Sequence, residues 1–161
     1  MARHVSNAAR LLGDDRAPVT IVVGLDDTDA ALHALDYAIG AARRSNGRVI
    51  AAHAQQLITP VASISLLTPA AGATSEAAVR SAESAVNALA ALSHAARLES
   101  GVDIQFRVLH GDPATALAEL ATDVCADLVI VGASRHPGSH LFSSVSRRLN
   151  RKARWPLAIV P

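Results

Sequence analysis

Two short segments of the chain carry residue types that suit contact with an anionic ligand. Residues 24–28 (GLDDT) close the apolar run 18–25 (PVTIVVGL), and residues 132–145 (GASRHPGSHLFSSV) follow a second apolar run. Glycine lets backbone N–H groups approach a phosphate, and serine and arginine side chains donate hydrogen bonds to one. The two segments therefore raise the question whether they cradle a ligand or only lead strands into helices.

The local alternatives to ligand contact are helix caps and turns. Thr28 suits the N-cap of a helix whose first turn would hold Asp29, and Asp26 could hold the same turn by accepting backbone N–H bonds. Ser143 and Ser144 stand at the expected start of the final helix. There they either only cap the helix or also contact an anion, and both alternatives stay open.

Sequence motifs of enzymes and metal sites are missing from the chain. It contains neither a nucleophile-elbow G-x-S-x-G nor a P-loop G-x-x-x-x-G-K-[ST]. The single cysteine, Cys125, excludes an internal disulfide and a cysteine-cluster metal site, and its apolar neighbours predict a buried thiol. His136 and His140 enclose a Pro-Gly pair that does not suit a helix, which argues against a metal pair. We therefore predict no catalytic residue and no metal site.

Apolar periodicity predicts the elements that would position the two segments. Apolar runs predict strands at residues 18–25, 48–54, 102–109, 127–131 and 155–160. Apolar stripes at spacings of three and four predict helices at residues 29–44, 74–97, from 113 onward, and 143–154. Asp112-Pro113 is a specific helix start, because Asp caps a helix and Pro is tolerated at its first position. Residues 55–73 form a long connection.

Strands that alternate with helices in this way must run parallel, with right-handed crossovers. The predicted fold class is α/β, with a single doubly wound, five-stranded parallel sheet and helices on both faces. Ligands of such sheets bind beyond the carboxyl ends of the strands, where residues 24–28 and the segment from Gly132 both emerge. His53 and His110 also follow strands, and they either line this cleft or are partly buried and hydrogen-bonded.

Composition and charge suit one domain with a sizeable core, since half of the 161 residues are hydrophobic and 18% are charged. We expect residues 1–17 to be a flexible N-terminal extension and residues 18–161 to be the domain. The sequence has no apolar run typical of a signal peptide or a membrane span, and its cysteine content fits a cytoplasmic location. Net charge is +1, but six basic residues and no acidic one follow Asp127. This basic end is either a solvated helix face or a surface for phosphate, nucleic acid or an acidic partner.

The chain resembles the universal stress protein family over residues 18–161, and the likeness rests on three places. The first is VVGLDDTDAALHALDYA, with its strand, aspartate and helix. The second is LHGDPATALAELATDVCADLVIVGAS, with its Gly-Asp-Pro helix start. The third runs from Gly132 through SSVSRRL to WPLAIVP. The resemblance implies a Rossmann-like fold of the universal stress protein type.

The resemblance also implies a binding site. Members that bind ATP have a Gly, a second Gly three residues later, and a Gly-Ser or Gly-Thr pair beyond, and their first aspartate meets the adenine. Gly132 keeps the first position, Arg135 replaces the second glycine, and Ser143-Ser144 replaces the pair two residues early. Arg135 either fills the space of a phosphate or pairs with it, and Asp27 would repel phosphates unless a divalent cation intervened. The residues assigned to this site are Gly24, Leu25, Asp26, Asp27, Thr28, Ala54, Gly132, Ala133, Ser134, Arg135, Gly138, Ser143, Ser144 and Val145.

The function that the resemblance implies is that of a non-catalytic stress-response or signalling protein. It would bind an adenine nucleotide, ATP with Mg²⁺, through a degenerate phosphate loop; the alternative is an interaction module that acts through a protein partner and binds no nucleotide. The family pairs its last strands, so we expect a homodimer through Leu157, Ala158, Ile159 and Val160. We expect neither membrane association nor nucleic-acid binding.

Overall fold

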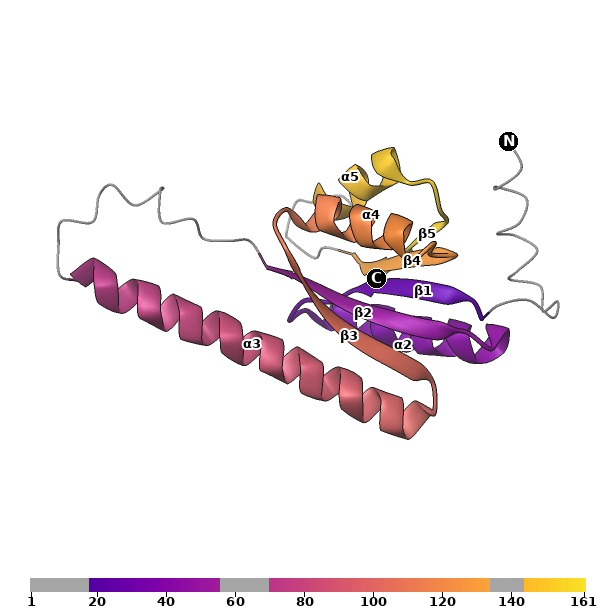
Figure 1. The fold of residues 1–161 in the computed structure, drawn as a ribbon, viewed down its shortest axis with the longest axis horizontal. Helices are drawn as coiled ribbons and strands as arrows, with labels where there is room; N and C mark the ends of the chain where they lie inside the picture. The colour runs from indigo at the N-terminus through magenta and orange to yellow at the C-terminus, as the bar shows by residue number, and fades with distance from the viewer. Residues whose placement is uncertain (1–17, 56–69, 134–143) are drawn as a thin grey trace.

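A computed structural model of the chain describes residues 18–55, 70–133 and 144–161. The expected extension 1–17 lies outside these residues, as do four of the assigned site residues: Ser134, Arg135, Gly138 and Ser143. Helices and strands carry the labels of Figure 1.

Five parallel strands form one sheet in the order β3-β2-β1-β4-β5. The strands are β1 Thr20–Gly24, β2 Arg48–Gln55, β3 Asp103–His110, β4 Leu128–Gly132 and β5 Leu157–Val160. All five lie within two residues of the predicted runs, and the predicted fold class is confirmed. The strand order reverses at β1, because β2 and β4 flank it on opposite sides. Such a reversal is the usual place for a ligand in an open α/β sheet.

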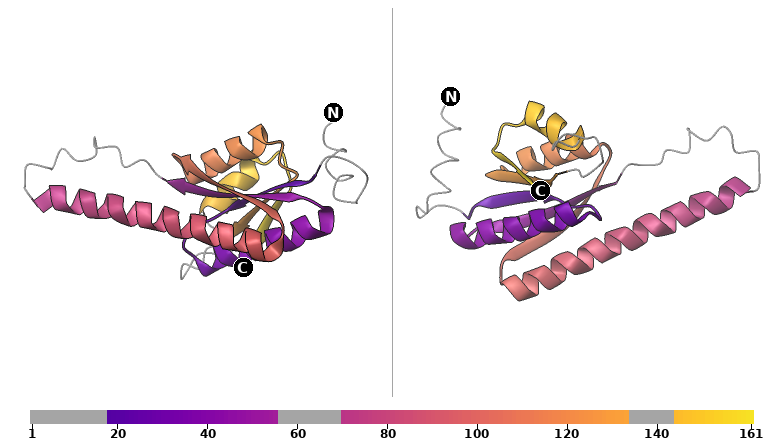
Figure 2. Two further views of the ribbon diagram at one scale, coloured as in Figure 1. Left: turned by 60° about the horizontal axis from the view of Figure 1, so that its bottom comes forward. Right: turned by 180° about the vertical axis from the view of Figure 1, so that it is seen from behind.

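Helices cover both faces of the sheet, as Figures 1 and 2 show. Helices α2 and α3 pack on one face, and α4 and α5 pack on the other. Their bounds are α2 Asp29–Ser45, α3 Ala70–Ser100, α4 Pro113–Asp123 and α5 Ser144–Lys152. The central strand, β1, is continuously apolar because both of its faces are buried. Ile21 and Val23 belong to the core beneath α2, whereas Val22 belongs to the core beneath α4.

Capping residues start the helices where the sequence predicts. Thr28 is the N-cap of α2, and its hydroxyl oxygen accepts a bond from the Ala31 amide at 3.2 Å. Asp112 caps α4, with Pro113 directly after it. Each cap fixes the first turn of a helix at the carboxyl edge of the sheet, so the same residues that begin the helices also shape that edge.

Helix α3 is longer than the helix predicted over residues 74–97. It extends well past the sheet at its N-terminal end (Figure 1), so only its C-terminal part covers the strands. Within the apolar stripe that predicts this helix, Leu89 is 6% exposed but Val79 is 52% exposed. The stripe has the right period for a helix, but the period does not reveal that the helix is longer than the strands beneath it.

Cys125 also departs from prediction, because its side chain is exposed rather than buried. It lies in the turn between α4 and β4, where its backbone takes the left-handed conformation with φ of 50°. Across the described part of the chain, no helix is long and apolar enough to cross a lipid bilayer.

Candidate functional site

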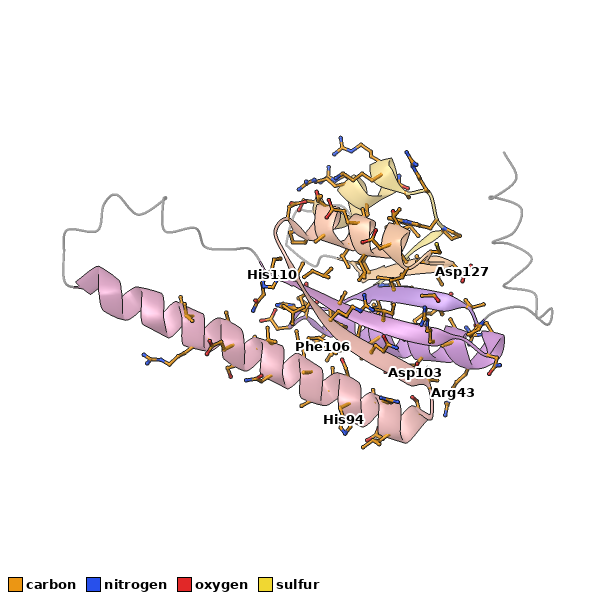
Figure 3. All side chains as sticks on the ribbon, viewed as in Figure 1. Arg43, His94, Asp103, Phe106, His110 and Asp127 are labelled. Atoms are coloured by element: carbon orange, nitrogen blue, oxygen red, sulfur yellow. The ribbon has the colours of Figure 1, made fainter. Side chains whose placement is uncertain are left out.

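A cavity of about 600 Å³ opens at the carboxyl ends of β1, β2 and β4. In Figure 3, His110 marks the carboxyl ends of the strands, where the cavity lies, and Asp127 marks their amino ends. The site residues that the sequence assigns and that line this cavity are Gly24, Leu25, Asp26, Asp27, Thr28, Ala54, Gly132, Ala133 and Val145. Ser144 begins α5 but is not among the lining residues. The structure thus brings together residues from both segments, which are more than 100 positions apart.

Asp26 and Thr28 are locked to each other at the mouth of the cavity. One carboxylate oxygen of Asp26, Oδ1, accepts a hydrogen bond from the Thr28 amide at 3.0 Å and another from the Thr28 hydroxyl at 2.5 Å. These bonds confirm the predicted turn-holding role of Asp26. These bonds engage Oδ1 only, and Asp26 is exposed and lines the cavity, so its carboxylate keeps the capacity to accept a further bond.

Gly132 is required by close packing of β4 against the start of α2. A Cβ atom at this position would lie 2.7 Å from the carbonyl carbon of Ala30 and 2.8 Å from the Ala31 nitrogen. These are backbone atoms, which cannot rotate away as a side chain would. The glycine therefore brings the end of β4 against the first turn of α2, and this contact sets the floor of the cavity between them.

The cavity lining carries negative charge. Asp26, Asp27 and Asp29 are exposed at its rim, and the described part of the lining includes no Lys or Arg. Asp27 and Asp29 flank the N-cap of α2, where carboxylates offset the partial positive charge of the helix N-terminus. That helix end is therefore a poor anion site. A phosphate would be better placed near the first turn of α5, from which Val145 reaches the cavity.

Comparison with known families decides the identity of the fold. The family model described as the universal stress protein family matches residues 19–161, nearly the whole chain. The chain belongs to the universal stress protein family. Comparison of its sequence with curated proteins found no match.

Solved structures of universal stress proteins share this architecture. One, determined in complex with cAMP, is 28% identical, with a TM-score of 0.64 over 90% of this chain and 98% of that chain. UspA from Lactobacillus plantarum is 20% identical, with a TM-score of 0.72 over 91% of this chain and 100% of that chain. A universal stress protein from Arabidopsis thaliana, determined with AMP bound, is 18% identical, with a TM-score of 0.62 over 89% and 91%.

Other residues of this universal stress protein line the cavity but are absent from the assigned set: Asp29, Ala30, Ala31, Ala52, His53, Pro113, Leu117 and Val131. Most are small or apolar core residues at strand and helix ends. The exceptions are Asp29, an exposed carboxylate, and His53, whose Nδ1 lies 2.9 Å from the carbonyl oxygen of Leu25. A histidine directly after the apolar run of β2 is the signal from which it could have been assigned.

Two of the basic residues near the C-terminus already contact α4, so they are less available to a phosphate, nucleic acid or acidic partner than their charge suggests. Arg148 forms a two-pronged ion pair with Asp112 across 36 positions, and Lys152 donates to the Thr115 hydroxyl at 3.0 Å. This part of α5 is therefore not simply a solvated helix face, because two of its cations hold α4. In the described part of the chain, no cluster of His, Cys, Asp and Glu has the arrangement of a metal site.

Proposed function

We propose that this universal stress protein is a non-catalytic stress-response or signalling protein that binds an adenine nucleotide in the cavity at the carboxyl edge of the sheet. The observation that carries the proposal is the joint placement of Asp26, Ala54 and Gly132 around one cavity at the reversal of strand order. A volume of about 600 Å³ is within the usual range for small-molecule sites. The 28% identical relative determined in complex with cAMP supports the same class of ligand.

In the proposed complex, the base lies against Asp26 and the end of β2 at Ala54. The ribose meets Gly132 and Ala133 at the end of β4. The phosphate lies toward the start of α5, near Ser144, with Ser143 and Arg135 as further contacts that the sequence suggests. Binding would connect residues on either side of the segment 134–143 and so alter the surface offered to a partner.

The charge of the lining favours a ligand with few negative charges. Three carboxylates at the rim repel phosphates, and each additional phosphate adds to the repulsion. ATP would need Mg²⁺ to offset this repulsion, whereas AMP and cAMP carry one phosphate each. We therefore propose that a nucleoside monophosphate or a cyclic nucleotide binds more tightly than ATP.

Thermal unfolding of the whole chain with AMP, cAMP and ATP, each with and without Mg²⁺, tests the proposal. A ligand at 100 times its Kd adds about 2.7 kcal/mol to the free energy of unfolding, which is readily measured as a rise in Tm. The Asp27→Asn variant removes one rim charge, and it should strengthen ATP binding more than AMP binding. If no nucleotide raises Tm at millimolar concentration, the nucleotide proposal fails.

The alternative function is a universal-stress-type interaction module that binds no nucleotide. The acidic rim and the two replaced motif glycines favour it. A protein partner would then recognise the same edge of the sheet directly. The thermal experiment separates the two functions, because the module predicts that Tm does not respond to any of the three nucleotides.

We also propose that the protein is a homodimer that pairs through β5. This strand lies at the edge of the sheet, bonded to β4 on one side, and all four of its residues are half-buried. An apolar edge strand offers a row of backbone groups to a second copy. The cytoplasm, where a lone thiol such as Cys125 stays reduced, is the proposed location.

A further inference from the structure

Three exposed arginines near the C-terminus take no part in the contact between α4 and α5. Arg147 and Arg151 lie on α5, and Arg154 follows in the turn that leads to β5. Among the hydrogen bonds and ion pairs of the described residues, none engages these three side chains, whereas Arg148 and Lys152 contact α4. The three residues, called here the outer arginines, therefore present their charge to solvent.

The charge of Arg147 does not stabilise the helix that carries it. Arg147 stands in the first turn of α5, where the helix dipole disfavours a cation, and that turn holds no acidic residue to offset it. Arg151 lies four residues further on, so the two like charges repel each other across one turn. With nine residues, α5 is too short to be stable without packing, and this repulsion weakens it further. A bound anion would relieve the repulsion, so the pair suits a ligand better than it suits the fold.

The spacing of Arg147 and Arg151 matches a regular row of carboxylates. Residues four apart on a helix are separated by about 6 Å along its axis, and glutamates four apart on a second helix have the same separation. A guanidinium binds a carboxylate through two parallel N–H bonds, as Arg148 does with Asp112 on the neighbouring helix. The chain thus already contains, one residue along from Arg147, the type of contact that an acidic segment would make.

The surroundings of the outer arginines favour a protein segment over other polyanions. A lipid surface needs exposed apolar side chains beside the cations. The large ones of the described residues all lie on α2 and α3, which cover the opposite face of the sheet: Leu32, Tyr37, Val79, Leu92 and Leu98. A nucleic acid strand would continue past α5 and over α4, where the exposed Glu119 and Asp123 would repel its phosphates. A short acidic segment can lie along α5 alone.

We propose that Arg147, Arg151 and Arg154 form a docking surface for an acidic segment of a protein partner, whose carboxylates each bind one guanidinium. None of the three arginines lines the cavity, so the inference does not depend on nucleotide binding. It gives a role to the basic residues that α4 does not engage. The partner would then lie on the face of the sheet that α4 and α5 cover.

Fluorescence anisotropy of the whole chain with labelled peptides tests the inference. One peptide has a glutamate at every fourth position of an alanine-rich helix, and the other has the same composition with its glutamates in one block. We expect the first peptide to bind more tightly, and its binding to weaken as salt rises, since exposed charges are screened. Arg147→Gln should weaken this binding by up to about five-fold, the most that one exposed ion pair contributes. It should leave Tm unchanged or raise it, because the fold loses only a repulsion.

Arg44→Gln is the matched control, because Arg44 is an exposed arginine of α2 on the other face of the sheet and its loss changes the net charge equally. It should leave peptide binding unchanged. Equal weakening by the two variants, or a lower Tm in Arg147→Gln, overturns the inference, since the charge would then act through the net charge or serve the fold. The inference is also overturned if wild type does not bind the first peptide, or binds a deoxythymidylate oligomer or phosphatidylserine vesicles more tightly.

Discussion

The guanidinium of Arg148 binds both carboxylate oxygens of Asp112, with nitrogen–oxygen distances of 2.6 and 2.8 Å. Asp112 is also the N-cap of α4, and it accepts bonds from the amide and the hydroxyl of Thr115 at 2.9 and 2.8 Å. One side chain therefore both starts α4 and fixes α5 to it. The pair therefore ties α5, whose first turn contributes Val145 to the cavity, to the start of α4.

Acid should weaken the contact between α4 and α5. Hydrogen bonds from Arg148, and then from Thr115, lower the pKa of Asp112 below its ordinary value of 3.8. The folded state thus favours the carboxylate, and the stabilisation is present above the unfolded pKa and is lost as pH falls through the lowered one. Asp112→Asn keeps a capping side chain but not the charge, so its Tm deficit at neutral pH should shrink in acid. A deficit independent of pH would contradict this role.

Two glycine-to-alanine substitutions should have opposite signs. Gly132→Ala places a methyl group against the backbone of Ala30 and Ala31, so we expect a loss of about 1–3 kcal/mol in the free energy of unfolding. Gly40→Ala lies inside α2, where the nearest atom is the flexible end of Arg44 at 3.3 Å. The gain in helix propensity there should add about 0.5–1 kcal/mol. Urea unfolding of both variants measures the difference, and a neutral Gly132→Ala would show that β4 can move away from α2.

A lysine in the edge strand should separate the proposed dimer. Ile159→Lys puts a charge in the middle of β5, where pairing with a second copy would bury it, so light scattering should report a monomer. Val79→Lys is the matched control, because Val79 is an exposed aliphatic residue of α3 far from β5 in sequence. It should leave the dimer intact. A dimer that survives Ile159→Lys, or a wild-type protein that is already a monomer, would contradict the proposed interface.

The sequence was sufficient to predict the fold because its signals are local. Each buried strand is an apolar run, and each described helix carries a stripe or a cap that can be read within one segment. Thr28 and Asp112-Pro113 placed two helix starts correctly, since the capping bonds join residues at most three positions apart. Alternation of strands and helices then left a doubly wound parallel sheet as the predicted topology.

Features that depend on contacts between residues far apart in the chain could not be predicted from the sequence. Arg148 pairs with Asp112 across 36 positions, whereas the sequence of the predicted helix 143–154 shows only that this helix is basic. Likewise Val79 and Leu89 belong to one apolar stripe of α3, although only Leu89 is buried against the sheet. Cys125 is exposed because it lies in the turn between α4 and β4, and its apolar neighbours in the sequence do not reveal that turn.

The candidate site was predicted in outline for the same reasons. Asp26 and Gly132 end strands that the topology places side by side, so their convergence follows once β1 and β4 are known to be neighbours. For His53 two alternatives stayed open, because the ring donates its hydrogen bond to the carbonyl oxygen of Leu25, which lies 28 positions away just after β1. Gly132 is also needed for the packing of β4 against the first turn of α2, whether or not a ligand binds. The spacing of the motif glycines does not reveal this packing role.

The cavity straddles the line where β1 meets β4. Across this line the first three strands of the chain join the last two, through pairings such as Val22 with Val129. Lining residues come from both sides, with Ala54 on one and Val145 on the other. A small molecule held there would touch both halves of the sheet at once, so it would add a link to the one that α2 already makes by packing against β4 and β5 as well as β1.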